Sequence, residues 1–197
     1  MTGVRVFLGL TAGVALSLAG LYRYFTYEAS PAKPNLSAPE MPERFAGLAA
    51  VAANLPTPEN CACAQPRVPS AMLLMNGTSD PVNPYNGGDV SFFGLQSRGT
   101  VLSSHETARF FAQVNGITEP PSRVQLPHVE ASGETSVTLS HYSQPGRHPV
   151  VEVTVVNGGH VLPNPDFRPR RFLGKSTRDV DGPAFIWEFF SGLTSSR

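Results

Sequence analysis

Two short apolar runs, each ended by an Asn-Gly pair, limit most strongly how this chain can fold. The run from Ala71 to Met75 is continuously apolar, and its shortness favours a buried strand. The run from Val150 to Val156 is β-branched almost throughout, which is the clearest strand signal in the chain. Because buried apolar strands separated by helices are typical of parallel sheets, we expect an α/β fold.

Two further segments are candidate strands. Phe45 to Ala53 is an apolar run, and periodicity alone does not decide there between helix and strand. Ser136 to Tyr142 is a candidate for another strand between the two predicted helices.

The two helices are predicted from the signals at their starts. Ser103 and Glu106 have the spacing of a capping box ahead of residues 107–114. Asp181 precedes a Gly-Pro pair, and proline is favoured in the first turn of a helix. The second helix carries an apolar stripe that we expect to face the core: Phe185, Ile186, Trp187, Phe189 and Phe190.

The N-terminal part differs in composition from the rest of the chain. Residues 6–22 form an apolar run bracketed by arginines. Its length is at the lower limit for a helix that spans a bilayer of about 30 Å, and its pattern is also typical of a secretory signal peptide. We therefore expect residues 1–27 to be a signal peptide or membrane anchor and the protein to be secreted or periplasmic. Residues 28–43 contain repeated prolines, which exclude a helix and predict an extended linker. The globular domain is expected over residues 44–197.

The charge balance argues against a nucleic-acid partner. The chain has 15 Lys+Arg and 15 Asp+Glu, a formal net charge of zero, whereas nucleic-acid binders normally carry a basic excess. Its two cysteines, Cys61 and Cys63, are too few for a disulfide framework or a four-cysteine zinc site. We expect no metal and no cofactor, and contact with a membrane only through the N-terminal segment.

A carboxylate and a histidine follow the two clearest strands. Asp80 lies in the loop after the first run, and His160 lies directly after the second. Catalytic groups in open α/β sheets gather beyond the carboxyl ends of strands, and a carboxylate that orients a histidine is part of a Ser-His-Asp triad. Each residue alone fits a turn or a surface loop, but the order of acid then histidine is that of the α/β-hydrolases. The other histidines receive no role: His105, His128, His141 and His148.

Several short motifs also stand in a characteristic order. They are residues 42–51 (PERFAGLAAV), 76–81 (NGTSDP), 84–88 (PYNGG), 158–160 (GGH) and 179–183 (DVDGP). Together they resemble the polyhydroxybutyrate depolymerase and feruloyl esterase family of secreted α/β-hydrolases, over about residues 41–192.

This resemblance implies a function and a fold. Asp80 would be the triad acid and His160 the general base of a carboxylic-ester hydrolase. Its substrate would be a polyester, a feruloylated polysaccharide or a short acyl ester. The fold would be a partial α/β-hydrolase, with the last three parallel strands near residues 47–53, 71–76 and 150–156 and flanking helices. One strand edge of such a sheet would be exposed, and we expect self-association through it.

The chain departs from this family at the nucleophile. No Gly-x-Ser-x-Gly motif occurs anywhere in the sequence. Ser79 is a neighbour of Asp80, but adjacent residues on one turn rarely aim at a common histidine. Three readings stay open: an ester hydrolase, a non-catalytic truncated remnant or anchored binding protein, and part of a site that a separate polypeptide completes.

Overall fold

The computed structural model describes residues 45–60, 68–92, 94–95, 97–166 and 169–194. The predicted N-terminal segment and linker, as well as Cys61 and Cys63, lie outside the described residues. Within the part that is described, no helix is both long enough and apolar enough to cross a membrane.

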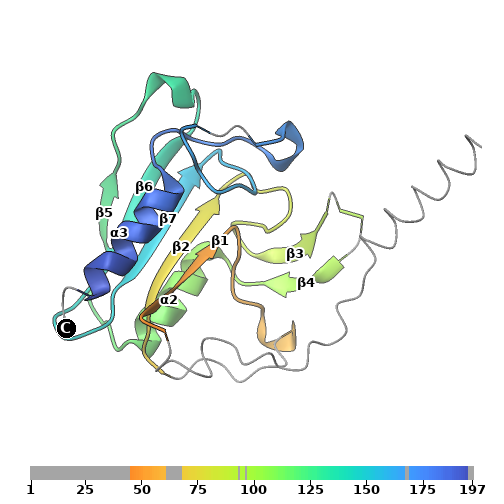
Figure 1. Cartoon of the computed structure of the whole chain (residues 1–197). Helices are drawn as coiled ribbons and strands as arrows, with labels where there is room; N and C mark the ends of the chain where they lie inside the picture. Colours follow the sequence, from red (N-terminus) through yellow and green to blue (C-terminus); the bar gives the residue numbers. More distant parts are fainter. Residues whose placement is uncertain (1–44, 61–67, 93, 96, 167–168, 195–197) are drawn as a thin grey trace, which may run out of the picture. The chain divides into compact units, whose positions relative to one another are not determined.

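A five-stranded mixed sheet forms the centre of the domain (Figure 1). In spatial order its strands are β1 (Gly47–Val51), β2 (Ala71–Gly77), β7 (Val150–Val156), β6 (Ser136–Tyr142) and β5 (Ser122–Gln125). β1 pairs with β2 and β2 with β7, both in parallel. These pairings confirm the three adjacent parallel strands predicted from the sequence, and β6 confirms the further candidate strand.

Beyond β7 the sheet differs from the expected parallel arrangement. β6 pairs antiparallel with β7, and β5 pairs antiparallel with β6. Only residues 143–149 connect β6 to β7, and a parallel return would need a crossover of about a dozen residues or more. The sequence pattern also missed β5 and a separate antiparallel hairpin, because these strands are short and mostly exposed. The hairpin consists of β3 (Gly88–Ser91) and β4 (Ser97–Val101).

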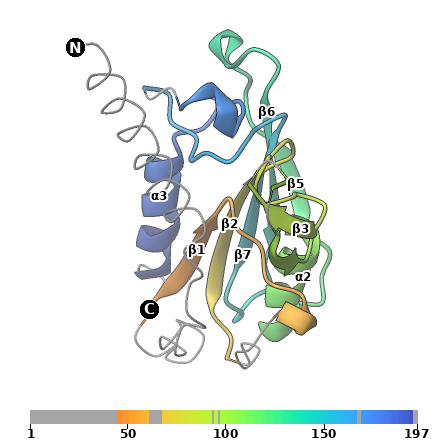
Figure 2. The same cartoon turned by 90° about the vertical axis from the view of Figure 1, so that its right-hand side faces the viewer.

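Two helices cover opposite faces of the sheet (Figure 2). They are α2 (Ser104–Val114) and α3 (Gly182–Thr194). The predicted capping box is present before α2: the Ser103 hydroxyl accepts from the Glu106 N–H at 3.1 Å, and the Glu106 carboxylate accepts from the Ser103 N–H at 2.9 Å. Three short 3-10 turns complete the described elements: η3 (Pro58–Asn60), η4 (Glu130–Ser132) and η5 (Arg171–Leu173).

β2 is buried on both faces, and its side chains alternate between two apolar clusters. Met72 and Leu74 belong to the cluster beneath α2, whereas Leu73 and Met75 belong to the cluster beneath α3. A strand covered on both sides has no solvent-facing positions, which explains why the sequence there is apolar without alternation.

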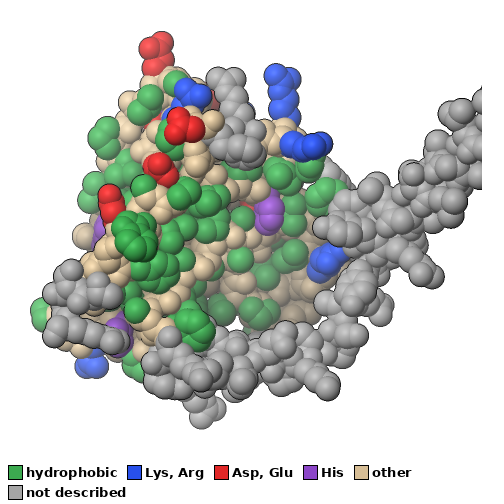
Figure 3. Space-filling view, viewed as in Figure 1, with side chains coloured by type: hydrophobic (Ala, Val, Ile, Leu, Met, Phe, Trp, Pro, Cys, Tyr) green, Lys and Arg blue, Asp and Glu red, His purple; other side chains and the backbone are tan. Residues whose placement is uncertain are grey.

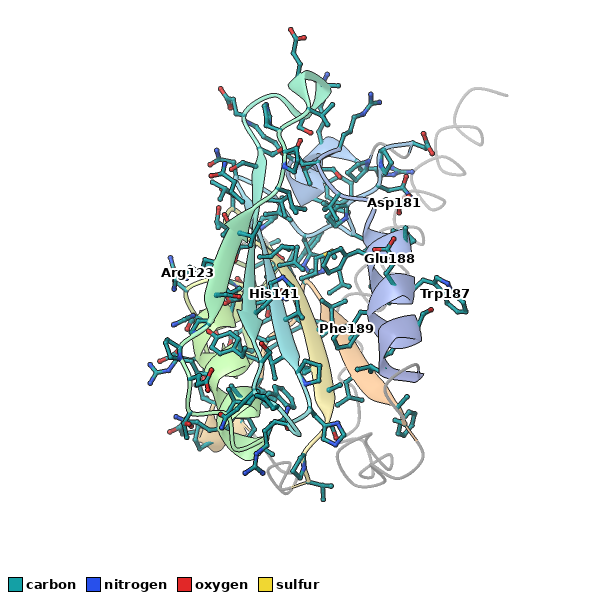
Figure 4. The ribbon with its side chains drawn as sticks, turned by 90° about the vertical axis from the view of Figure 1, so that its left-hand side faces the viewer. Arg123, His141, Asp181, Trp187, Glu188 and Phe189 are labelled. Atoms are coloured by element: carbon teal, nitrogen blue, oxygen red, sulfur yellow. The ribbon has the colours of Figure 1, made fainter. Side chains whose placement is uncertain are left out.

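Trp187 does not join the core-facing stripe of α3, so this prediction was wrong. Its side chain is 73% exposed and points away from the sheet in Figure 4, whereas Phe189 lies between α3 and the strands. Phe185, Ile186 and Phe189 pack against the cluster on that face. At about 100° per residue, these three positions share one side of the helix and Trp187 falls on the opposite side.

Replacement of Leu74 by alanine tests the cluster beneath α2. Leu74 is fully buried, so we expect Leu74→Ala to lower the free energy of unfolding by about 2–5 kcal/mol through lost burial and an unfilled cavity. Urea denaturation followed by far-UV circular dichroism measures this change. Leu95→Ala is the matched control, because Leu95 is 83% exposed and should change stability by less than about 0.5 kcal/mol. Similar losses in both variants would contradict the described core.

Candidate active site

Asp80 and His160 meet at the carboxyl ends of two adjacent parallel strands. Asp80 follows β2, His160 follows β7, and the Asp80 Oδ2 atom lies 2.9 Å from His160 Nδ1. The structure therefore brings together the two residues that the sequence analysis selected, although 80 positions separate them in the chain.

The Asp80 carboxylate is held from its other side by its own loop. Its Oδ1 atom accepts the backbone N–H groups of Val82 at 2.8 Å and Asn83 at 2.9 Å. The side chain is 1% exposed, so little water competes for these bonds. This local turn leaves Oδ2 as the oxygen that faces His160.

The backbone on both sides of His160 is fixed by a neighbouring segment. The Gly159 N–H donates to the Lys175 carbonyl at 2.8 Å, and the His160 N–H donates to the Leu173 carbonyl at 2.7 Å. A Cβ atom on Gly159 would lie 2.0 Å from the Leu173 carbonyl oxygen, so glycine is required for this approach. The imidazole itself is 33% exposed, which leaves it accessible to a reacting group.

The end of β2 also approaches the end of β7 more closely than a side chain would allow. A Cβ atom on Gly77 would lie 2.3 Å from the Gly158 carbonyl oxygen. The same carbonyl accepts the Ser79 N–H at 2.8 Å, one residue before Asp80. The turns at Gly77 and Gly158, which the sequence predicted as the ends of β2 and β7, therefore also hold the Asp80 and His160 loops together.

Tyr85 anchors the far end of the Asp80 loop to the sheet. Its hydroxyl lies 2.9 Å from the Thr154 hydroxyl on β7, and its carbonyl accepts the N–H of Ser104 at the start of α2. Burial, together with the nearby Glu152 carboxylate, raises the pKa of Tyr85 above its ordinary value against the opposing hydrogen bond from Thr154. The phenol therefore stays neutral and serves as a hydrogen-bonding group.

This geometry is suited to general acid–base chemistry. A carboxylate at Nδ1 fixes the orientation of the ring and stabilises its protonated form, so Nε2 can accept and return a proton. Among the described residues, no serine hydroxyl hydrogen bonds to His160. The neighbouring Ser79 is held through its backbone, as described above.

A second group of serine, aspartate and histidine lies between η4 and the segment before α3, and the sequence analysis missed it. The Asp179 carboxylate accepts the Ser132 hydroxyl at 2.6 Å and the Val129 N–H at 2.8 Å, and it lies 3.1 Å from His128 Nδ1. Because the hydroxyl is bonded to the carboxylate rather than to the imidazole, this is not a catalytic triad. The cluster instead ties the two segments together, and its side chains come from positions too far apart for a local motif to signal.

The described residues contain no group of three or more His, Cys, Asp or Glu side chains placed to hold a metal ion.

The fold and the site define an α/β protein with a carboxylate–histidine pair at the ends of two parallel strands. No family model matches the chain, and no solved structure matches it. A protein of Nocardia uniformis subsp. tsuyamanensis named "Putative esterase NocK" is 32% identical over 162 residues. The match covers 79% of this chain and 46% of the Nocardia protein, so the chain spans about half the length of this relative. The similarity supports an esterase-like relationship.

Exchange of Asp80 for asparagine tests the orientation of the pair. Because Oδ1 must still accept two backbone N–H groups, the new amide nitrogen would occupy the position of Oδ2 and donate to His160 Nδ1. We expect Asp80→Asn to move the proton of the neutral ring from Nδ1 to Nε2, which ¹⁵N chemical shifts of His160 report directly. The exposed carboxylate of Asp89 provides the control, since Asp89→Asn should leave these shifts unchanged. An unaltered tautomer in Asp80→Asn would rule out the proposed contact.

The Asp179 cluster predicts a pH-dependent contribution to stability. Burial alone raises the pKa of Asp179, but the hydrogen bonds from Ser132, Val129 and His128 outweigh it and hold the pKa below its usual range. This stabilisation is therefore complete above the unfolded-state value of about 3.9 and is lost as the pH falls through the lower folded-state pKa. We expect Asp179→Asn to destabilise the protein by about 1–3 kcal/mol at pH 7 and by less near pH 3.

Urea denaturation at the two pH values measures the difference. Asp166→Asn is the control, because Asp166 is exposed and should change stability little at either pH. A loss in Asp179→Asn that stays the same at both pH values would contradict the stated linkage.

Proposed function

We propose that this chain is a serine-type carboxylic-ester hydrolase of the polyhydroxybutyrate depolymerase and feruloyl esterase group, within a partial α/β-hydrolase fold, with Asp80 as the triad acid and His160 as the general base and without a Gly-x-Ser-x-Gly elbow. The 2.9 Å contact between a buried carboxylate and an accessible imidazole is the observation that carries the proposal. The similarity to a protein named as an esterase supports the same reaction class.

In this reaction His160 Nε2 takes the proton of a serine hydroxyl as its oxygen attacks the ester carbonyl. The same nitrogen then returns the proton to the leaving alcohol as the carbon–oxygen bond of the ester breaks. Water repeats the sequence on the acyl-serine and releases the carboxylic acid. Asp80 stabilises the imidazolium that forms in each half of the cycle.

Apolar residues on the two segments that meet at His160 favour an ester with an apolar or aromatic acyl group. Leu162 follows His160 by two positions and is 38% exposed, and Phe172 precedes the residue whose carbonyl binds the His160 N–H. Phe172 also contacts Phe92 edge to face, at 6.4 Å between ring centroids. Figure 3 shows apolar side chains over α3 and between α3 and the β3–β4 hairpin, whereas charged side chains gather toward one end of this face.

The apolar segment at residues 6–22 supports the proposal of a secreted or periplasmic location, with that segment as signal peptide or anchor. Among the described strands, β1 pairs with β2 alone, which supports the proposed self-association through its outer edge.

A second candidate function is that of a non-catalytic or anchored binding protein. It is favoured by the absence of a Gly-x-Ser-x-Gly motif from the sequence and of a serine hydroxyl bound to His160 among the described residues. In that case the Asp80–His160 pair would act only to hold the two loops together.

Covalent labelling by a fluorophosphonate distinguishes the two functions, because the probe reacts with a serine that a neighbouring base activates. We expect the full chain to be labelled, and we expect His160→Ala to abolish labelling. Hydrolysis of p-nitrophenyl acetate should fall at least about a hundredfold in the same variant, and peptide mapping identifies the nucleophile.

His128→Ala is the matched control, since His128 also lies beside a buried carboxylate and should leave both readouts unchanged. A folded chain that is neither labelled nor hydrolytic would overturn the esterase proposal and favour the binding protein.

A further inference from the structure

A cavity lies on the face of the sheet covered by α2, away from the Asp80–His160 pair. It has a volume of about 490 Å³ and is bounded by α2, by residues 117–121 and by β5. Its polar lining combines His105 and Arg109 from α2 with Arg123 from β5 and Tyr142 from β6. Figure 4 shows Arg123 on the side of the sheet opposite α3.

One wall of this cavity is a hydrogen-bond network that joins the partly exposed His105 to the buried Tyr142 and Glu152. The Tyr142 hydroxyl lies 3.2 Å from His105 Nδ1, and the same nitrogen lies 3.5 Å from the Glu152 carboxylate. Glu152 is 2% exposed and also accepts the Ser104 hydroxyl at 2.9 Å. Because these contacts occupy the Nδ1 edge of the imidazole, Nε2 is the ring nitrogen available to a ligand.

The Tyr142 phenol is able to donate to His105 Nδ1. Burial, reinforced by the Glu152 charge, raises the pKa of Tyr142 to about 12, so its hydroxyl keeps its proton. When the neutral His105 ring accepts that proton at Nδ1, its own N–H lies at Nε2. In the imidazolium form both nitrogens carry protons, so Nε2 remains a donor.

The two guanidinium groups at the cavity are free to contact a ligand. Among the described residues, neither Arg109 nor Arg123 forms an ion pair. The nearby Glu106 carboxylate is bonded to the N-cap of α2 and also interacts electrostatically with Arg109, and Glu119 is the acidic side chain in the lining. Both arginines line the same cavity as Tyr142.

We propose that this cavity binds the oxyanion group of a small ligand, a carboxylate or a phosphate. Arg109 and Arg123 pair with its charge, and His105 Nε2 donates a hydrogen bond to it. Planar guanidinium groups suit both kinds of oxyanion because each can donate two parallel hydrogen bonds. Glu152 acts as a positioning residue for the protonated ring, in which the Nδ1–H of His105 can donate to the Glu152 carboxylate.

The proposal is tested by titration calorimetry of the full chain with inorganic phosphate and, separately, with succinate. The two titrations show whether the cavity binds a phosphate or a carboxylate. We expect saturable binding of at least one probe, with about tenfold weaker binding in Arg123→Gln and a larger loss in the Arg109→Gln/Arg123→Gln double variant. Arg123 is exposed on the outermost strand β5, so the single variant keeps the test decisive if the double variant fails to fold.

Arg147→Gln is the control for nonspecific loss of charge, because Arg147 is exposed and does not line the cavity. It should bind the probe as the unmodified chain does. Failure of both probes to bind saturably, or equal weakening in Arg147→Gln and Arg123→Gln, would overturn the assignment.

Discussion

Parallel pairing sets Asn76 of β2 opposite Thr154 of β7 and Gly77 opposite Val155, so both strands end at the same level of the sheet. A slip of one residue would turn every side chain of a strand to the other face, so the β2 side chains that now pack in one apolar cluster would have to fit into the other. Because of this fixed register, Asp80 and His160 lie side by side beyond the carboxyl ends of the two strands. The glycines at these strand ends then allow the loops to approach within contact distance, so the site depends on backbone packing as much as on its polar residues.

Beneath the site, a buried polar network joins three strands to α2. The Asn76 side chain donates to Asn54 after β1 and to the Ser104 hydroxyl, both at 3.0 Å, and Ser104 donates to Glu152 on β7. A buried polar group without a partner costs about 1–3 kcal/mol, so alternative packings that separate these groups are disfavoured. The network thus favours one position of α2 relative to the strands, and this position also fixes the end of the Asp80 loop.

The sequence predicted those features whose causes are local. The capping box before α2 and the apolar run of β2 each lie within a few residues, and Asp80 and His160 could be selected because they follow clear strands. Glu152 gave no such signal, since a single acidic residue in a β-branched run is ordinary. Its burial depends on Ser104, which lies far away in the chain. Likewise, Trp187 was assigned to the core because the helix is apolar on several sides, and only the packing of α3 shows which side is covered.

Trp187 is the single tryptophan of the chain, and it stands on the outer surface of α3 with 73% of its side chain in contact with solvent. Its indole emission should therefore resemble that of a hydrated fluorophore even in the native protein, and it should shift little when the two apolar clusters come apart. The same position makes it a sensitive optical probe of a different event. Anything that covers α3 would dehydrate the indole, shift its emission to shorter wavelength and shield it from soluble quenchers.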